Sequence, residues 1–304
     1  MRSLAAALLL VTMAQRLCAE NAGALYLQAR ELLRRDQVAP AVALLEKCVA
    51  AQPSNSSYHQ WLGRAIGLQV AENGVLAGLS GVSRVRGALE KAIELDRNNL
   101  EARRDLAVMY RVVPRILGGS REKAAEQVAI IRRSDPVLAT QIEGDFLARD
   151  KRYKEALAMY EKAVVLNPSR ARPHVSMATV YQEIKRWDDA FVALDRALAM
   201  EPSYPVALYH FGRTAASSGL QLDRGEKYLR SYLAMPLRKP ELEYPPLASA
   251  HFRLGWILER KGDVDGARAE YEEVLSIDPD HKKTRAAIAR LPKTKQTDRR
   301  SSGR

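Results

Sequence analysis

Residues 137–170 read VLATQIEGDFLARDKRYKEALAMYEKAVVLNPSR, and residues 171–204 read ARPHVSMATVYQEIKRWDDAFVALDRALAMEPSY. The two stretches are equally long and align without a gap. Three pairs of equivalent residues show the interval of 34 positions: Gly144 and Ala178, Ala156 and Ala190, and Pro168 and Pro202. Self-similarity at a fixed interval of this size indicates a stack of small repeated units, in which each repeat contacts only its neighbours.

Apolar residues within each repeat are spaced as in two amphipathic helices. In the first repeat this spacing occurs twice, in Leu25, Ala29 and Leu32 and again in Ala41, Leu45 and Cys48. Side chains three and four residues apart lie on one stripe of a helix, which is buried against the next helix. A small residue recurs in the first helix of every repeat, where a larger one would push the paired helices apart: Ala29, Gly63, Ala107, Gly144, Ala178, Gly212 and Gly255.

A repeat of 34 residues with a small residue in each of two helices and a closing proline resembles the tetratricopeptide repeat. The resemblance implies an all-α fold, a right-handed superhelical solenoid of about seven repeats with a C-terminal cap helix. The repeats are placed at about 22–55, 56–99, 100–136, 137–170, 171–204, 205–247 and 248–279, and the cap helix at 280–291. The pattern is similar to uncharacterised exported tetratricopeptide-repeat proteins of bacteria.

Three stretches depart from the regular repeat. Residues 69–83 form an insertion rich in glycine and apolar residues, which predicts a folded-back excursion. Residues 112–119 contain Pro114, which stops the preceding helix, and Ser120 is then expected to cap the next one. Four prolines between Pro236 and Pro246 predict a stiff linker without helix.

The N-terminus looks like a secretory signal peptide over residues 1–19. Its apolar stretch, residues 4–14, is shorter than the roughly 20 residues that span a bilayer. We expect cleavage after Ala19 and no integral membrane span thereafter, although lipidation of Cys18 stays open as an alternative. Cys48 is then the remaining cysteine and is expected to be a small buried hydrophobe. Export places the protein in the periplasm or outside a Gram-negative-type bacterium.

The formal net charge of the 304 residues is +12. The leader contributes +2 and the Lys/Arg-rich tail, residues 292–304, contributes +4, which leaves +6 for residues 20–291. We expect the tail to be disordered. The remaining excess favours attraction to acidic polymers or lipid surfaces, but it is not the clustered basic footprint of nucleic-acid binding.

No grouping of residues points to catalysis. The sequence has no Ser-His-Asp, Cys-His or paired-carboxylate arrangement whose spacing would bring its members together. We therefore expect neither an enzyme nor a cofactor. His59, His174 and His251 occupy equivalent places in their repeats. Positions a repeat or more apart are too distant to share one metal ion, and we expect no metal site.

The resemblance implies that the working surface is the concave groove formed by the outward positions of each first helix. Carried onto this sequence, the groove contains nine candidate residues: Tyr26, Arg30, Arg64, Arg104, Arg111, Tyr209, Arg213, Phe252 and Trp256. Aromatic residues and arginine often dominate binding energy, and arginine holds carboxylates through two parallel hydrogen bonds. The family's lysine- and asparagine-based clamp for peptide carboxylates is not matched, since the first repeat has Tyr26 and Arg30.

Two functions remain open from the sequence. The first is an exported interaction scaffold that binds a peptide segment of an envelope protein in the groove. The second is an envelope-surface protein that recognises an acidic glycan or anionic lipid through its basic repeats and tail. The sequence identifies neither the partner nor the oligomeric state.

Overall fold

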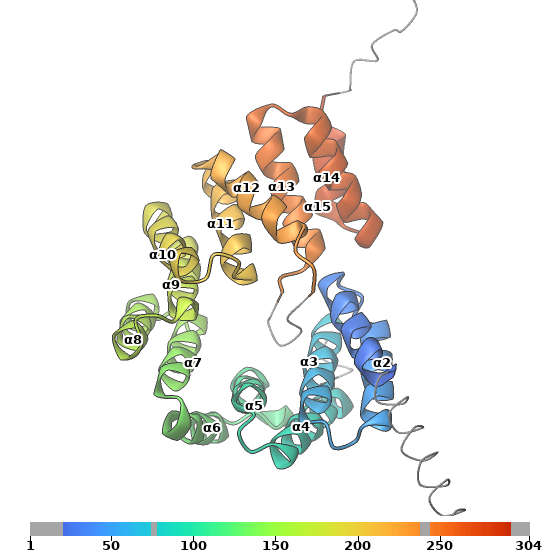
Figure 1. The fold of residues 1–304 in the computed structure, drawn as a ribbon, viewed down its shortest axis with the longest axis vertical. Coiled ribbons are helices and arrows are strands. Elements are labelled where there is room, and N and C mark those ends of the chain that lie inside the picture. The colour runs from blue at the N-terminus through green and yellow to red at the C-terminus, as the bar shows by residue number, and fades with distance from the viewer. Residues whose placement is uncertain (1–20, 74–77, 238–243, 293–304) are drawn as a thin grey trace, which may run out of the picture. The chain divides into compact units, whose positions relative to one another are not determined.

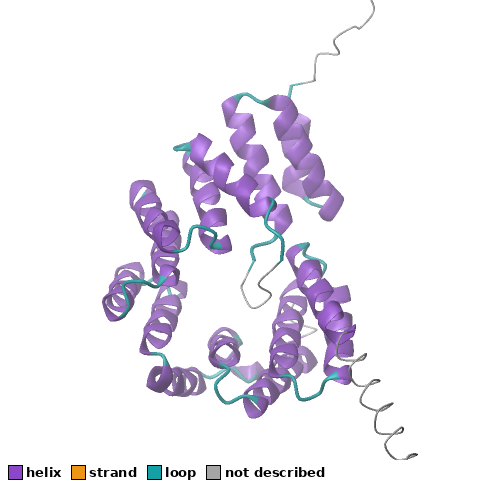
Figure 2. Cartoon of the chain, in the orientation of Figure 1, coloured by secondary structure: helices purple, strands orange, loops and turns teal. Residues whose placement is uncertain are grey.

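The computed structural model describes residues 21–73, 78–237 and 244–292. These residues form helices and connecting turns, and no β-strand occurs among them (Figures 1 and 2). The expected signal peptide, residues 1–19, and the expected tail beyond residue 292 lie outside the described residues. None of the helices in the described ranges is both long and apolar enough to cross a bilayer.

The helices follow one another in pairs, each with a first and a second helix. The pairs are residues 21–34 with α2 (Val38–Ala51), α3 (Ser56–Asn73) with α4 (Gly78–Leu95), α5 (Leu100–Val112) with α6 (Arg121–Ser134), α7 (Pro136–Arg149) with α8 (Tyr153–Leu166), α9 (Ala171–Glu183) with α10 (Trp187–Met200), α11 (Pro205–Ser218) with α12 (Leu222–Leu233), and α13 (Leu247–Lys261) with α14 (Val264–Ile277). The cap helix α15 (Lys282–Arg290) packs against α14. This succession confirms the predicted all-helical architecture of paired helices.

Two compact units divide the chain. Of the described residues, 21–73, 78–180 and 237 belong to unit 1, and 181–236 and 244–292 belong to unit 2. In unit 1 the core is continuous from the first helix to α6, and a second cluster around Ile131 and Ile142 joins α5, α6 and α7. Such layer-by-layer burial is what stacked helix pairs require, because no pair can bury its apolar stripe alone.

Small residues set the distance within the helix pairs, as predicted. A Cβ added at Gly144 would lie 2.8 Å from Cδ1 and 3.0 Å from Cζ of Tyr160, which is itself 1% exposed. A Cβ added at Gly255 would likewise lie 2.8 Å from Cδ1 of Tyr271. The tyrosines therefore fill the space that the glycines leave open.

Local capping fixes where the helices begin and end. Helix α5 ends at Val112 before Pro114, and the 3-10 turn η2 (Arg115–Leu117) follows it. The Ser120 hydroxyl then accepts a hydrogen bond from the Lys123 amide at 3.1 Å, which confirms its predicted role as the cap of α6. Burial raises the pKa of the Cys48 thiol, and Cys48 is fully buried as expected.

The prediction of a folded-back excursion over residues 69–83 was wrong. Helix α3 continues to Asn73 and α4 already begins at Gly78, so residues 69–73 and 78–83 are helical, while residues 74–77 lie outside the described residues. Gly81 shows why a glycine occurs in this helical stretch. It lies so close to Val70 that an added Cβ would overlap that side chain. This glycine serves a close helix contact rather than a turn.

Candidate interaction surfaces

The first turn of α5 is anchored to α3 by Asn99. Its side-chain carbonyl caps α5 by accepting a hydrogen bond from the Ala102 amide at 2.9 Å. Its amide nitrogen donates to Ser56 Oγ at 2.8 Å and to Gln60 Oε1 at 3.2 Å, both on α3. Residues one and two turns further along α5 therefore have fixed positions relative to α3.

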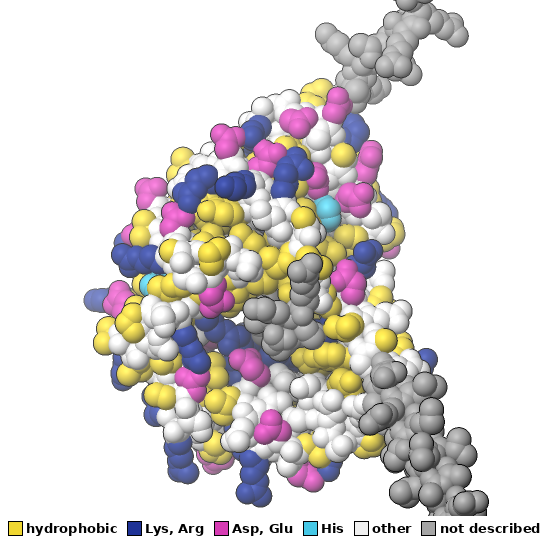
Figure 3. Space-filling model, in the orientation of Figure 1, with side chains coloured by type: hydrophobic (Ala, Val, Ile, Leu, Met, Phe, Trp, Pro, Cys, Tyr) yellow, Lys and Arg dark blue, Asp and Glu magenta, His cyan; other side chains and the backbone are white. Residues whose placement is uncertain are grey.

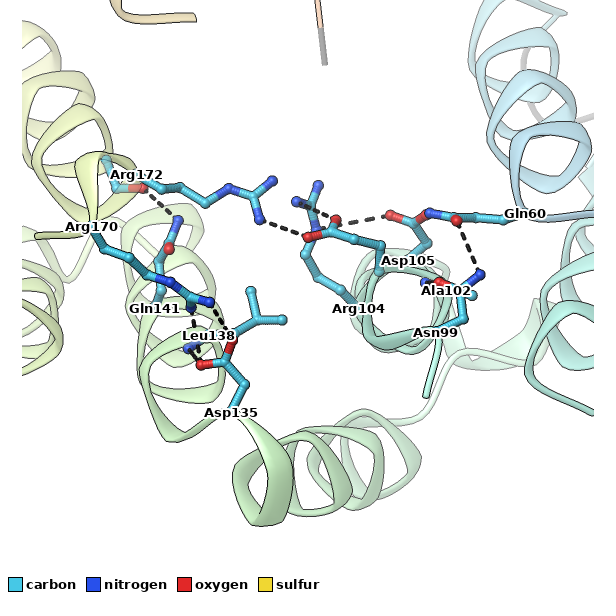
Figure 4. A network of polar contacts seen from close by, with 12 residues as sticks. Gln60, Asn99, Ala102, Arg104, Asp105, Asp135, Leu138, Gln141, Arg170 and Arg172 are labelled. Atoms are coloured by element: carbon cyan, nitrogen blue, oxygen red, sulfur yellow. Dashed lines mark hydrogen bonds and ion pairs between the residues drawn. The ribbon is translucent and has the colours of Figure 1, made fainter. Parts of the chain in front are cut away.

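A cluster of charges lies on this anchored face of unit 1 (Figure 4). Asp105 accepts hydrogen bonds from Arg64 Nε at 2.5 Å and Arg64 Nη2 at 3.0 Å. Glu101 accepts from Arg64 Nη2 at 3.2 Å and from Arg172 Nη1 at 2.9 Å. Arg104 Nη1 lies 3.1 Å from the Glu101 carboxylate. We call this cluster the acid–arginine hub; its members are Arg64, Glu101, Arg104, Asp105 and Arg172.

The hub draws on three first helices that are distant in the sequence. Arg64 lies on α3, the two acids and Arg104 lie on α5, and Arg172 lies on α9. Figure 4 shows the Arg172 side chain extending from α9 toward α5, and Arg172 and Glu101 are separated by 71 residues. The hub is therefore a property of the stacked first helices and not of any single repeat.

Arginine stacking continues from the hub toward the N-terminus. Two guanidinium groups contact the Trp61 ring, with Arg30 3.1 Å and Arg64 4.6 Å from its centroid. Cation–π contacts of this kind stabilise both partners. Arg30 is only 2% exposed, so it cannot be a groove contact residue, and we exclude it from the proposed binding surface. Tyr26 stacks on Tyr58 with a centroid distance of 5.1 Å.

A pocket lies beside Arg111 at the end of α5. The Arg111 guanidinium pairs with Asp150 and lies 5.7 Å from the Phe146 ring centroid. The pocket has a volume of about 180 Å³. Apolar side chains of α6 and α7 line it together with Arg111, Arg121, Arg132 and Glu143. Of those arginines, Arg132 is paired with Glu143.

Unit 2 presents an aromatic surface on α11 and α13. Phe252 and Trp256 are half-buried, with ring centroids 6.4 Å apart. The Arg253 guanidinium lies 5.9 Å from the Phe252 centroid and 5.7 Å from the Trp256 centroid. Tyr209 is half-buried on α11, and hydrophobic side chains gather over this part of unit 2 (Figure 3).

Positive charge lies beside His210, whose pKa is strongly lowered. Burial lowers the pKa of His210 to about 3, and the guanidinium groups of Arg213 and Arg253 add to this effect. Arg213 itself pairs with Glu183 at 3.3 Å. His210 therefore stays neutral near pH 7.

The three equivalent histidines have different surroundings. His59 lies 2.8 Å from the Pro53 carbonyl, and His251 pairs with Glu270 at 2.7 Å. His174 is 3% exposed. Within the described ranges, no group of three or more histidine, cysteine and acidic side chains could hold a metal ion.

The candidate residues from the sequence thus fall into two sets. In unit 1, Arg64 and Arg104 belong to the hub, Arg111 lies at the neighbouring pocket, Tyr26 stacks on Tyr58 and Arg30 is buried. The candidates of unit 2 are Tyr209, Arg213, Phe252 and Trp256. Sequence reasoning missed the two hub acids. Their spacing of four residues on the face that carries Arg104 was the available signal. It also missed Arg172, for which no local signal exists.

Comparison with known proteins agrees with this architecture. The family model described as Tetratricopeptide repeat matches residues 248–281. The chain is similar to tetratricopeptide-repeat proteins. The structure of the APC/C hetero-tetramer Cut9–Hcn1 superposes with a TM-score of 0.53 at 15% identity, covering 86% of this chain and 48% of that one. That likeness supports the solenoid fold alone.

Other similarities are more distant or partial. PilW, a widely conserved type IV pilus biogenesis factor, gives a TM-score of 0.49 at 19% identity over 77% of this chain and 98% of that one. Cellulose synthase operon protein C of Pseudomonas fluorescens is 28% identical over 145 residues, 47% of this chain. The human protein O-mannosyl-transferase TMTC1 is 26% identical over 46% of this chain. The matches span 11% and 19% of the lengths of these two curated proteins.

Proposed function

We propose that the protein is a non-enzymatic scaffold that binds a peptide segment of a partner protein along the first-helix face. One observation carries the proposal, namely that charged or aromatic side chains gather on first helices within each unit. Helices α3, α5 and α9 supply the hub in unit 1, and α11 and α13 supply the aromatic surface in unit 2. Stacked repeats use such extended surfaces for recognition.

The composition of both surfaces suits a protein segment. Tyrosine, tryptophan and arginine are the residue types most often responsible for binding energy in protein interfaces. The hub guanidiniums are paired with carboxylates, so an incoming segment must exchange ion pairs rather than fill an empty site. Exchange of this kind favours specificity over raw affinity.

The test is capture of partners by the full mature chain and by matched variants. Arg104→Gln combined with Trp256→Ala is expected to lose partner capture, because it removes one contact from each surface. Arg64 is left in place because it holds Asp105. The control combines Arg133→Gln on α6 with Arg196→Gln on α10, both exposed positions on second helices. Equal capture by the two double variants would refute the site assignment, provided that circular dichroism shows both to be folded.

We further propose that the protein is exported and that its partner belongs to the bacterial envelope. This proposal rests on the signal-like sequence of residues 1–19. N-terminal sequencing of the protein purified from its own cells is expected to start at Glu20. A chain that still begins at Met1 and is found with cytosolic markers would rule out export.

Binding to an acidic glycan or anionic lipid is the second candidate. The pocket beside Arg111 favours it, since its lining combines apolar side chains with three arginines, which suits an amphipathic anion that takes the place of the acids paired with Arg111 and Arg132. Binding through exposed charges weakens steeply as ionic strength rises, whereas binding that buries aromatic rings persists. Salt-resistant capture of a protein, without retention on anionic vesicles, would exclude this candidate.

A further inference from the structure

The two acids of the hub differ in how they are held, although they lie one helical turn apart. The Asp105 side chain is 11% exposed and binds Arg64 through two nitrogens, with a third hydrogen bond from Gln60 Nε2 at 3.2 Å. The Glu101 side chain is 40% exposed. Asp105 is thus a fixed part of the packing, whereas Glu101 borders solvent.

Glu101 nevertheless attracts three guanidinium groups. Its Oε1 accepts from Arg172, and its Oε2 lies within 3.2 Å of both Arg64 and Arg104. Each contact is the kind of charge-assisted hydrogen bond that arginine makes with carboxylates. An exposed side chain with this many cationic partners occupies the position where any other carboxylate on this face would bind.

The charge balance of the hub favours an acidic occupant. Three arginines and two acids give the five side chains a formal charge of +1. If Glu101 turns into solvent, where its carboxylate is readily hydrated, the remaining four groups carry +2. A carboxylate from another chain would restore the pairing, whereas a lysine at the same place would be repelled.

We propose that Glu101 is an internal ligand, whose carboxylate holds the place of an acidic side chain from a bound partner segment. The inference rests on the proposed function and specifies its partner chemistry: unit 1 takes an acidic segment, for which Glu101 competes. Arg104 and Arg172 then release Glu101 and pair with the partner. Asp105 keeps Arg64 in position throughout.

The experiment measures binding of a fluorescein-labelled peptide of alternating glutamate and alanine to the full mature chain at low ionic strength. Glu101→Gln removes the competing charge and should tighten binding about fivefold, since exposed ion pairs are individually weak. Arg172→Gln should weaken binding. Peptides with glutamine or lysine in place of glutamate should bind neither the original protein nor the Glu101→Gln variant.

The matched control is Glu122→Gln, which removes the same charge from the first turn of a second helix, α6. It should leave the affinity unchanged. The inference is overturned if Glu101→Gln does not bind the acidic peptide, if it binds no tighter than the original protein, or if Glu122→Gln tightens binding equally. Glu101→Ala provides the same readout should the glutamine variant fail to fold.

Failure of this inference can be told apart from failure of the proposed function. If Glu101→Gln has no effect on the peptide while the double variant Arg104→Gln/Trp256→Ala still loses partner capture, the internal-ligand role is wrong and the scaffold remains. If that double variant captures its partners normally as well, both are wrong.

Discussion

Replacement of Gly144 by alanine tests how closely the paired helices are packed. The new Cβ would lie 2.8 Å from Cδ1 and 3.0 Å from Cζ of Tyr160, well inside ordinary carbon contacts. The Tyr160 ring is buried and its hydroxyl donates to Asp145 at 2.8 Å, so it cannot move freely. Overpacking of this kind costs about 1 to 3 kcal/mol.

The gain in helix propensity must be separated from this cost. Alanine is favoured over glycine inside a helix by about 1 kcal/mol. Gly87 on α4, also in unit 1, supplies the control because nothing lies within 4 Å of a Cβ added there. Gly87→Ala should therefore stabilise the protein by about 1 kcal/mol. The two variants should differ by about 1 to 3 kcal/mol, which is the packing cost alone.

A second substitution provides the rescue. The repeat that follows pairs Ala178 with Leu194, at the same spacing of 16 residues that separates Gly144 from Tyr160. In the background of Tyr160→Leu, the change Gly144→Ala should no longer be destabilising. The double-mutant cycle should thus show a favourable coupling of about 1 kcal/mol or more.

The assay is urea unfolding followed by far-UV circular dichroism, together with hydrogen exchange of peptides from α7 and α8. Hydrogen exchange is needed because stacked repeats open locally and need not unfold in one step. Equal stability of Gly144→Ala and Gly87→Ala, or absence of coupling with Tyr160→Leu, would refute the packing argument.

Three further predictions concern single side chains. Asp105→Asn should destabilise unit 1 by about 1 to 3 kcal/mol in urea unfolding, because Arg64 loses its buried carboxylate partner; unchanged stability would contradict the fixed role of Asp105. His210 takes up a proton in the unfolded chain near its ordinary pKa of about 6.5 but in the fold only near pH 3. The contribution of His210 to stability should therefore fall by about 2 kcal/mol between pH 7.5 and 5, and His210→Gln should abolish this loss. Ser120→Ala should cost about 1 kcal/mol and speed hydrogen exchange at the start of α6, since the cap is lost.

The helix pairs were predictable because their determinants are local and repeated. Gly144 and Gly255 are each followed 16 residues later by a tyrosine, and each glycine packs against that tyrosine. The contact within a helix pair can therefore be inferred from the sequence spacing. Gly81 was misread because glycine can serve either a turn or a close helix contact. At Gly81 the need is close approach to Val70, which only the three-dimensional structure reveals.

For the charged first-helix positions of unit 1, the sequence allowed the residue types to be listed but not their pairing. Arg64 and Arg104 were identified from their positions on first helices, and both lie in the hub. Their partners could not be found in this way, since the contact between Glu101 and Arg172 spans 71 residues. Arg30 was misplaced because its stacking on Trp61 depends on how two neighbouring first helices pack.

The claim that the first-helix face is the working surface is tested most directly by site-specific photocrosslinking in the protein's own cells. A photoreactive phenylalanine is placed at position 104 on α5 in one variant and at position 133 on α6 in another. The account predicts a discrete partner adduct from position 104 and none from position 133. Equal adducts from both positions, or an adduct from position 133 alone, would contradict it.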